Sequence, residues 1–188
     1  MSNRTLSWKT IQSTITYTKK WLAIQEDICA LPDGRIIDPY IVIQVPSFCN
    51  VFMVTANEEV VMVKQYRHAA GIETLELPGG MIEQHEDPRL AAIREMTEET
   101  GYSTEHIDLL FSVNPNPPLE NNRAYFYLAT NVQSNRPTNY DAFEDMDIVL
   151  LSKTDFMQKL LAHEFKHGTQ IGAMYAAAIQ LGWLQKAI

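Results

Sequence analysis

Runs of apolar and β-branched residues, separated by turn-forming residues, dominate the first two thirds of the chain. Such runs predict β-strands, because branched and aromatic side chains fit the pleated surface of a sheet. Three runs precede Pro46 and predict a small antiparallel sheet, with a turn at Pro32-Asp33-Gly34. The predicted strands are 11–19, 21–31, 35–45, 48–55, 59–66, 72–77, 108–113, 123–129 and 146–151.

A helical periodicity replaces the strand pattern at 88–100 and twice more near the C-terminus, at 153–167 and 169–185. Asp87 is placed to cap the first helix, and Gly101 suits the left-handed position that follows its last turn. The mixture of strands and helices predicts an α+β or α/β sandwich. We expect an α+β fold, an α/β/α sandwich, with a small N-terminal antiparallel β-sheet. We expect an N-terminal region at 1–46 and a larger domain at 47–188.

The acidic balance of the chain argues against some classes of partner. Its 188 residues carry a formal charge of −8, which disfavours binding to nucleic acid or to an anionic membrane. No run of 18 apolar residues predicts a membrane span, and the N-terminus lacks the apolar core of a signal peptide. Cys29 and Cys49 form no CxxC pair, and we expect buried free thiols in a reducing compartment. These features predict a cytoplasmic protein.

Three glutamates crowd one face of the predicted helix at 88–100. Glu95, Glu98 and Glu99 stand three and four positions apart, so a helix places their mutually repelling carboxylates side by side. A solvated acidic face is the simplest interpretation, and Pro78-Gly79-Gly80 just before the helix favours another. Glycine backbone can bring a carbonyl close to the cluster, and clustered oxygens suit Mg²⁺ or Mn²⁺. The opposite arc of the helix, expected to pack into a core, holds Leu90, Ala92, Ile93, Met96 and Thr97.

The glutamates belong to a longer motif, from Gly80 to Tyr102, that resembles the Nudix box. Three further segments, QYR at 65–67, ELPGG at 76–80 and LPDGR at 31–35, are similar to the ADP-ribose pyrophosphatase branch of that family, which also includes hydrolases of other nucleotide sugars. Two aliphatic positions of the box hold a methionine and a tyrosine here. The fixed residues, all present at the spacing of the box, are Gly80, Glu86, Arg94, Glu95, Glu98, Glu99 and Gly101.

The resemblance implies the Nudix fold and a divalent-metal-dependent hydrolysis. The expected reaction cleaves the diphosphate bond of ADP-ribose or a related nucleoside diphosphate sugar, giving a nucleoside monophosphate and a sugar phosphate. Two or three Mg²⁺ ions, or Mn²⁺ in their place, are expected at the box. Arg94 and Glu86 are interpreted as a salt bridge that shapes the loop and helix, and Gly80 and Gly101 as structural. The expected metal ligands are the carbonyl of Gly79 and the carboxylates of Glu95, Glu98 and Glu99.

The resemblance also suggests roles for residues outside the box. In the acidic segment FEDMDIV at 143–149, Glu144 is the predicted general base, with Asp141, Asp145 and Asp147 as competitors, and Glu98 is a second catalytic candidate. Arg67 is expected to bind a substrate phosphate, although a surface salt bridge is an alternative. The expected remaining substrate contacts are Trp21, stacking on the base, and Glu76, facing either the metals or the substrate.

Relatives in this branch pair as homodimers through the N-terminal sheet, and we expect the same here. Which nucleotide sugar is cleaved stays open, because that choice rests on the loops 114–122 and 132–143. GDP-mannose, a dinucleotide or coenzyme A are alternative substrates, and a non-catalytic nucleotide-sensing domain is an alternative function. The segment His163-Glu164-Phe165-Lys166-His167 also matches the zinc-protease pattern HExxH, which we interpret as a chance match because no third ligand follows.

Overall fold

The computed structural model describes residues 5–140 and 145–185, which divide into two compact units. Unit 1 contains the chain up to Pro46 together with Asn114–Arg123, and unit 2 contains Ser47–Val113 and the chain from Ala124 onward. The segment Asn114–Arg123, which lies far beyond residue 46 in sequence, joins unit 1 through backbone pairing. The amide of Ile43 donates to the carbonyl of Leu119 at 2.7 Å.

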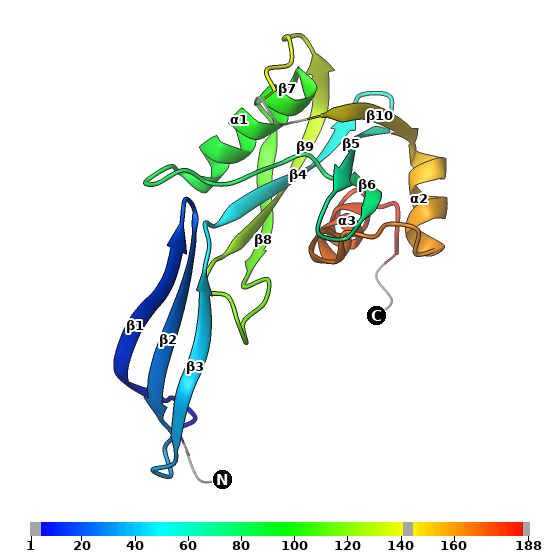
Figure 1. The fold of residues 1–188 in the computed structure, drawn as a ribbon. Helices are drawn as coiled ribbons and strands as arrows, with labels where there is room; N and C mark the ends of the chain where they lie inside the picture. Colours follow the sequence, from blue (N-terminus) through cyan, green and yellow to red (C-terminus); the bar gives the residue numbers. More distant parts are fainter. Residues whose placement is uncertain (1–4, 141–144, 186–188) are drawn as a thin grey trace. The chain divides into compact units, whose positions relative to one another are not determined.

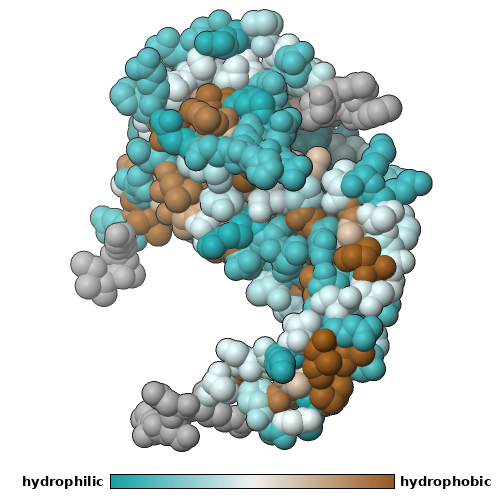
Figure 2. Space-filling view, turned by 90° about the vertical axis from the view of Figure 1, so that its left-hand side faces the viewer, coloured by the Kyte–Doolittle hydropathy of each residue, from teal (hydrophilic) through white to brown (hydrophobic). Residues whose placement is uncertain are grey.

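Unit 1 is a three-stranded antiparallel sheet in the order β1-β2-β3 (Figure 1). Its strands are β1 (Lys9–Lys19), β2 (Leu22–Ala30) and β3 (Ile36–Gln44), as the apolar runs predict within two residues. Every residue of β1 is exposed, so this strand contributes little to the core of its own unit. Apolar side chains therefore appear on the surface of unit 1, in the lower half of Figure 2; those of β1 are Ile11, Ile15 and Tyr17.

Unit 2 is built on a seven-stranded mixed sheet. The path β10-β5-β4-β9-β7 carries β6 beside β5 and β8 beside β9, and the pairing of β4 with β9 is parallel. The short strand β7 and the extension of β9 to Ser134 are absent from the predicted pattern. The bounds are β4 (Phe48–Thr55), β5 (Glu59–Arg67), β6 (Ile72–Glu76), β7 (Tyr102–Ser103), β8 (Ile107–Val113), β9 (Ala124–Ser134) and β10 (Met146–Ser152).

Helices cover both faces of this sheet (Figure 1). They are α1 (Pro88–Thr100), α2 (Lys153–Leu161) and α3 (Gly168–Gln180). Successive side chains of a strand point to opposite faces, so Val51 and Met53 of β4 join a core with α1, while Phe52 and Val54 join a core with α2 and α3. The predicted α/β/α sandwich is therefore confirmed.

The helix boundaries agree with the periodicity at α1 and differ at the C-terminal pair. α2 ends at Leu161 rather than at residue 167, and the connection to α3 contains His163 in a left-handed conformation with φ of 58°. None of the helices in the described residues is long and apolar enough to cross a membrane. Both cysteines are free and buried, as predicted.

Candidate active site

Helix α1 begins and ends where its capping residues predict. The side chain of Asp87 accepts hydrogen bonds from the amides of Arg89 at 2.9 Å and Leu90 at 3.1 Å, and Pro88 occupies the first helical position. Gly101 has φ of 70°, and its amide donates to the carbonyl of Thr97. A side chain at Gly101 would meet the carbonyl of Arg136 at 2.4 Å, so both conformation and space require glycine there.

The observed burial of side chains on α1 differs at two positions from the burial that the helical periodicity predicts. Ala92 and Met96 are buried against the sheet as predicted, but Leu90 is exposed. Glu99 is only 4% exposed, although the wheel places it with the acidic arc. The cause is the loop at 78–80, which crosses this end of the helix: the amide of Gly79 donates to Oε2 of Glu99 at 2.8 Å.

Arg94 connects the helix to the loop that precedes it. Its Nε and Nη2 bind the two carboxylate oxygens of Glu86 at 2.9 Å each, in a bidentate pair. Nη2 also donates to the carbonyl of Met81 at 3.2 Å, while Nη1 binds Glu95 at 2.8 Å and Glu98 at 3.3 Å. The hydrogen bonds between Arg94 and Glu86 are the largest cause of two pKa shifts: they raise the pKa of Arg94 and lower the pKa of Glu86. This ion pair is the one that the sequence predicts.

The glycine loop passes very close to both the sheet and the helix. A side chain at Gly79, whose φ is 146°, would lie 2.1 Å from the carbonyl oxygen of Cys49. A Cβ at Gly80 would lie 2.6 Å from the carboxylate of Glu95. The thiol of Cys49 lies beneath the loop, and burial is the largest cause that raises its pKa to about 12, so this thiol stays protonated at neutral pH.

A cavity of about 790 Å³ opens between this loop, the acidic face of α1 and the end of β5. Asp145 and Asn139 also line it, and the amide of Asn139 donates to the carbonyl of Glu98 at 2.8 Å. Tyr66, in the QYR segment, is an exposed aromatic residue of the lining that the sequence did not single out. The predicted site residues that line the cavity are Arg67, Gly79, Gly80, Arg94, Glu95, Glu98 and Glu99.

Arg67 and Glu76 form a bidentate ion pair at the edge of this cavity. The Nε and Nη2 atoms of Arg67 bind the two carboxylate oxygens of Glu76 at 2.8 and 2.6 Å, and the hydroxyl of Thr74 also donates to Glu76. Burial alone would raise the pKa of Glu76, but the hydrogen bonds from Arg67 and Thr74 outweigh it and leave the pKa lowered. The Glu76 side chain has no exposed surface, whereas Arg67 keeps 44% exposure. Arg67 is thus the member of the pair that a ligand can reach.

The carboxylates of α1 are the kind of oxygen donor that a divalent cation such as Mg²⁺ prefers. Three carboxylates lie on one face, and the missing side chain of Gly80 leaves Glu95 its space. In the described parts of the chain, no three His, Cys, Asp or Glu side chains lie close enough together to hold a metal. Arg94 and the amide of Gly79 bind the carboxylates instead. A cation at this face would therefore compete with Arg94 for Glu95 and Glu98.

The remaining predicted site residues are the general-base candidates and Trp21. Glu144 and Asp141 lie outside the described residues, and Asp145, the residue that follows Glu144, lines the cavity. Asp147 does not line this cavity. Trp21 belongs to unit 1, between β1 and β2, and is 56% exposed.

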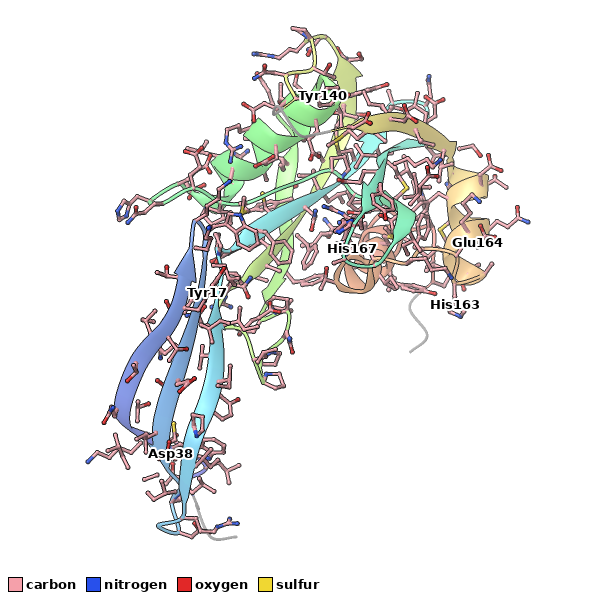
Figure 3. All side chains as sticks on the ribbon, viewed as in Figure 1. Tyr17, Asp38, Tyr140, His163, Glu164 and His167 are labelled. Carbon is pink, nitrogen blue, oxygen red and sulfur yellow. The ribbon has the colours of Figure 1, made fainter. Side chains whose placement is uncertain are left out.

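The HExxH segment does not form a metal-binding helix. It occupies the connection between α2 and α3, where a positive φ at His163 breaks the helical spacing. Glu164 pairs with Lys159 at 2.8 Å, and His167 lies near Glu76, with 3.8 Å between Nε2 and the carboxylate. Figure 3 shows His163 and Glu164 apart from His167. The arrangement excludes the i, i+4 histidine pair of a zinc protease.

Comparison with known proteins agrees with this geometry. The model of the NUDIX domain matches residues 45–169, and the model of the nucleoside diphosphate sugar hydrolase N-terminal domain matches residues 8–43. The chain is 30% identical over 151 residues to a methanol dehydrogenase activator of Bacillus methanolicus, a match that covers 80% of this chain and 81% of that protein. It is 28% identical over 181 residues to an ADP-ribose pyrophosphatase of Mycobacterium tuberculosis, covering 95% and 87%.

A solved structure shows the same fold. The crystal structure of an ADP compounds hydrolase superposes with a TM-score of 0.82 at 14% sequence identity, covering 99% of this chain and 100% of the other. The acidic helix, its glycine loop and the Arg94–Glu86 pair thus occur in a chain whose match to the NUDIX domain spans more than half its length. The chain therefore belongs to the Nudix hydrolase family.

Proposed function

We propose that this protein hydrolyses the diphosphate bond of ADP-ribose or a related nucleoside diphosphate sugar, with Mg²⁺ or Mn²⁺, to a nucleoside monophosphate and a sugar phosphate. One observation carries the proposal: a single cavity has the carboxylates of α1 on one side and the exposed guanidinium of Arg67 on the other. A metal-bound diphosphate needs both, because the carboxylates hold the cations and the arginine binds phosphate oxygens. The names of the relatives support the choice of substrate.

The chemistry needs charge compensation and positioning more than covalent participation. Two or three divalent ions at α1 would neutralise phosphate oxygens and lower the pKa of the attacking water. In the proposed site Glu95 and Glu99 hold these ions, with Glu98 as a further ligand or catalytic group and the carbonyl of Gly79 as the fourth donor. Arg67 orients the diphosphate against them.

A general base completes the proposed site. Glu144 keeps this assignment as a proposal from the sequence. The position of Asp145 supports it, because this residue directly follows Glu144 in the chain and lines the cavity. Asp145 is the competitor that the cavity favours.

A set of activity assays tests the function. Purified protein is incubated with ADP-ribose, GDP-mannose, UDP-glucose or FAD, with and without Mg²⁺, and the nucleoside monophosphate is separated by chromatography. We expect Mg²⁺-dependent release from at least one nucleotide sugar and faster turnover of ADP-ribose than of FAD. Binding of these ligands without any turnover would instead support the nucleotide-sensing alternative, against which the retained carboxylates of the box argue.

We also propose a homodimer that acts in the cytoplasm. The exposed apolar side chains of β1 support the dimer, because contiguous apolar surface on a soluble protein is often an interface. The two free buried cysteines agree with a reducing compartment. Trp21 remains the proposed stacking partner of the base, and Trp21→Ala should raise KM with little change in kcat. Sedimentation of the wild-type chain as a monomer at micromolar concentration would contradict the dimer.

A further inference from the structure

Residues 76 to 80 form a continuous link between the two charged sides of the cavity. At one end, Glu76 holds Arg67 in a bidentate ion pair. At the other end, the amide of Gly79 binds Glu99 at 2.8 Å, and Gly80 lies against the carboxylate of Glu95. The geometry of the whole site therefore depends on how this short segment is held.

Sheet pairing holds both ends of the segment but not its middle. β6 ends at Glu76, which pairs with Val63 of β5. Further along, the amide of Val51 donates to the carbonyl of Pro78 and the amide of Cys49 donates to the carbonyl of Gly80, both at 2.9 Å. The peptide groups of Leu77 fall between these two pairings. They are buried, so they need partners from another element.

Gln170, in the first turn of α3, supplies those partners. Its Oε1 accepts from the amide of Leu77 at 2.7 Å, and its Nε2 donates to the carbonyl of Leu77 at 3.4 Å. The side chain is 1% exposed, and it binds one residue of backbone as a neighbouring strand would. Asn50 also donates to the carbonyl of Leu77, at 3.3 Å, but Gln170 is the group that accepts from its amide. Loss of this acceptor would leave a buried N–H without a partner, which is costly.

We propose that Gln170 is a positioning residue of the active site: it fixes Leu77 and, through it, the path of Gly79 and Gly80 past the carboxylates of α1. The inference rests on the proposed function of those carboxylates. His167, at the N-cap of α3, approaches Glu76 from the same turn, so the start of α3 contacts two consecutive residues of the segment. Gln170 lies outside the motif that identifies the family, and it does not line the cavity.

The test compares two substitutions on the same helix. Gln170→Met keeps the length and apolar bulk of the side chain but removes both hydrogen bonds, and Gln180→Met makes the same change at an exposed position. The first readout needs neither metal nor substrate: hydrogen exchange of the Leu77 amide, measured by NMR on the full chain. We expect exchange at least tenfold faster in Gln170→Met and unchanged exchange in Gln180→Met.

The second readout is steady-state hydrolysis of ADP-ribose with Mg²⁺. Gln170→Met should lower kcat by about tenfold or more, because small displacements of catalytic groups reduce rate strongly. KM should change by less than about twofold, because Glu76 still holds Arg67. Wild-type exchange at Leu77 together with wild-type kcat in Gln170→Met would overturn the proposal, and so would equal effects of Gln180→Met.

A third variant keeps the test valid if Gln170→Met does not fold. Gln170→Glu retains an oxygen that accepts from the Leu77 amide, and it should keep that amide protected and retain more kcat than any variant without an acceptor. Fast exchange at Leu77 in Gln170→Glu with wild-type kcat would overturn the proposal. If the wild-type chain hydrolyses none of the substrates, the proposed function fails, whereas the exchange measurement still decides the role of Gln170 in holding the loop.

Discussion

The two sides of the cavity use arginine–carboxylate pairs in opposite ways. On α1 and its preceding loop, the single guanidinium of Arg94 faces Glu86, Glu95 and Glu98, so carboxylates are in excess. At the end of β5, Arg67 faces one carboxylate, Glu76, and the pair is neutral. In the first case Glu95 and Glu98 reach the cavity. In the second case the acid is buried and Arg67 reaches the cavity.

This difference shows how one cavity can present both signs of charge. The excess negative charge on α1 is unfavourable without a cation, since like charges at this spacing repel each other. Arg67, by contrast, is fixed by a buried partner and needs no reorganisation to bind a phosphate. Substitutions on the two sides should consequently have different consequences: loss of turnover on the α1 side and loss of stability on the β5 side.

The largest expected effect is loss of turnover in Glu99→Gln. The substitution removes one charge from the proposed metal site and keeps the shape of the side chain. We expect kcat to fall by about a hundredfold or more, the magnitude associated with losing an electrostatic contribution to the transition state. Steady-state hydrolysis of ADP-ribose with Mg²⁺ measures it. The matched control is Glu105→Gln, at an exposed position outside the cavity, and an equal loss in both variants would contradict the assignment.

On the β5 side, Arg67→Gln should destabilise the fold. It leaves the buried carboxylate of Glu76 without its cationic partner, at a cost of about 3 kcal/mol in the free energy of unfolding. Urea unfolding at pH 7 measures this cost. The double substitution Arg67→Gln with Glu76→Gln removes the stranded charge and should recover most of the stability. A double variant as unstable as the single one would show that the charge is not the cause.

The same pair predicts a dependence on pH. The lowered pKa of Glu76 in the folded wild type means that the pair contributes stability above the unfolded-state pKa of about 4.3 and loses it as the pH falls through the folded-state value. In Arg67→Gln the arginine no longer offsets burial, so the pKa of Glu76 rises. Protonation of Glu76 at low pH then removes the buried unpaired charge and reduces the loss of stability in this variant. The stability difference between the two chains should therefore shrink as the pH falls from 7 to 4. A difference that is constant over this range would contradict the pairing.

Two glycine substitutions separate backbone conformation from carboxylate position. Gly80→Ala places a methyl group against the flexible end of Glu95, and we expect weaker Mn²⁺ binding, by about tenfold, with little loss of stability. Gly79→Ala places it against the backbone of Cys49 at a positive φ, and we expect a lower melting temperature. Calorimetry measures both melting and Mn²⁺ binding, and equal melting temperatures for the two variants would contradict this distinction.

The smallest expected effect concerns Arg94→Lys. Lysine keeps the positive charge but cannot form the bidentate contact with Glu86 together with the contacts to Glu95 and Met81. We expect a loss of about 1 kcal/mol in the free energy of unfolding, measured by urea denaturation. Arg89→Lys, on the same helix, is the control. No difference between the two variants would show that the charge of Arg94 matters more than its geometry.

Local features of the fold were predictable from sequence, and features that depend on distant segments were not. α1 is bounded by residues whose preferences are local, namely Asp87, Pro88 and Gly101. Its wheel could not reveal that Glu99 is buried, because a loop outside the helix covers it. The burial of Glu76 was unpredictable for the same reason. The alternating pattern of a strand shows which face Glu76 is on, but it does not show that Arg67 pairs with Glu76 in a buried site.

Gln170, the proposed positioning residue, has no signal in the sequence that points to the site. A polar residue near the start of an amphipathic helix is predicted to be solvent-exposed. Only the contact between α3 and Leu77 in the structure shows that Gln170 is buried. The long helix expected up to His167 fails for a related reason, since the left-handed turn at His163 is a conformation that composition does not predict. The box, in contrast, has fixed residues at fixed spacing, which made the acidic face recognisable from sequence.

The central claim is that the carboxylates of α1 form a divalent-metal site, and titration with Mn²⁺ in the absence of nucleotide tests it most directly. Electron paramagnetic resonance of free Mn²⁺ measures binding to the wild-type chain and to Glu99→Gln. We predict binding by the wild type and at least tenfold weaker binding by Glu99→Gln. Equal affinity in both chains, or no binding by the wild type, would contradict the account.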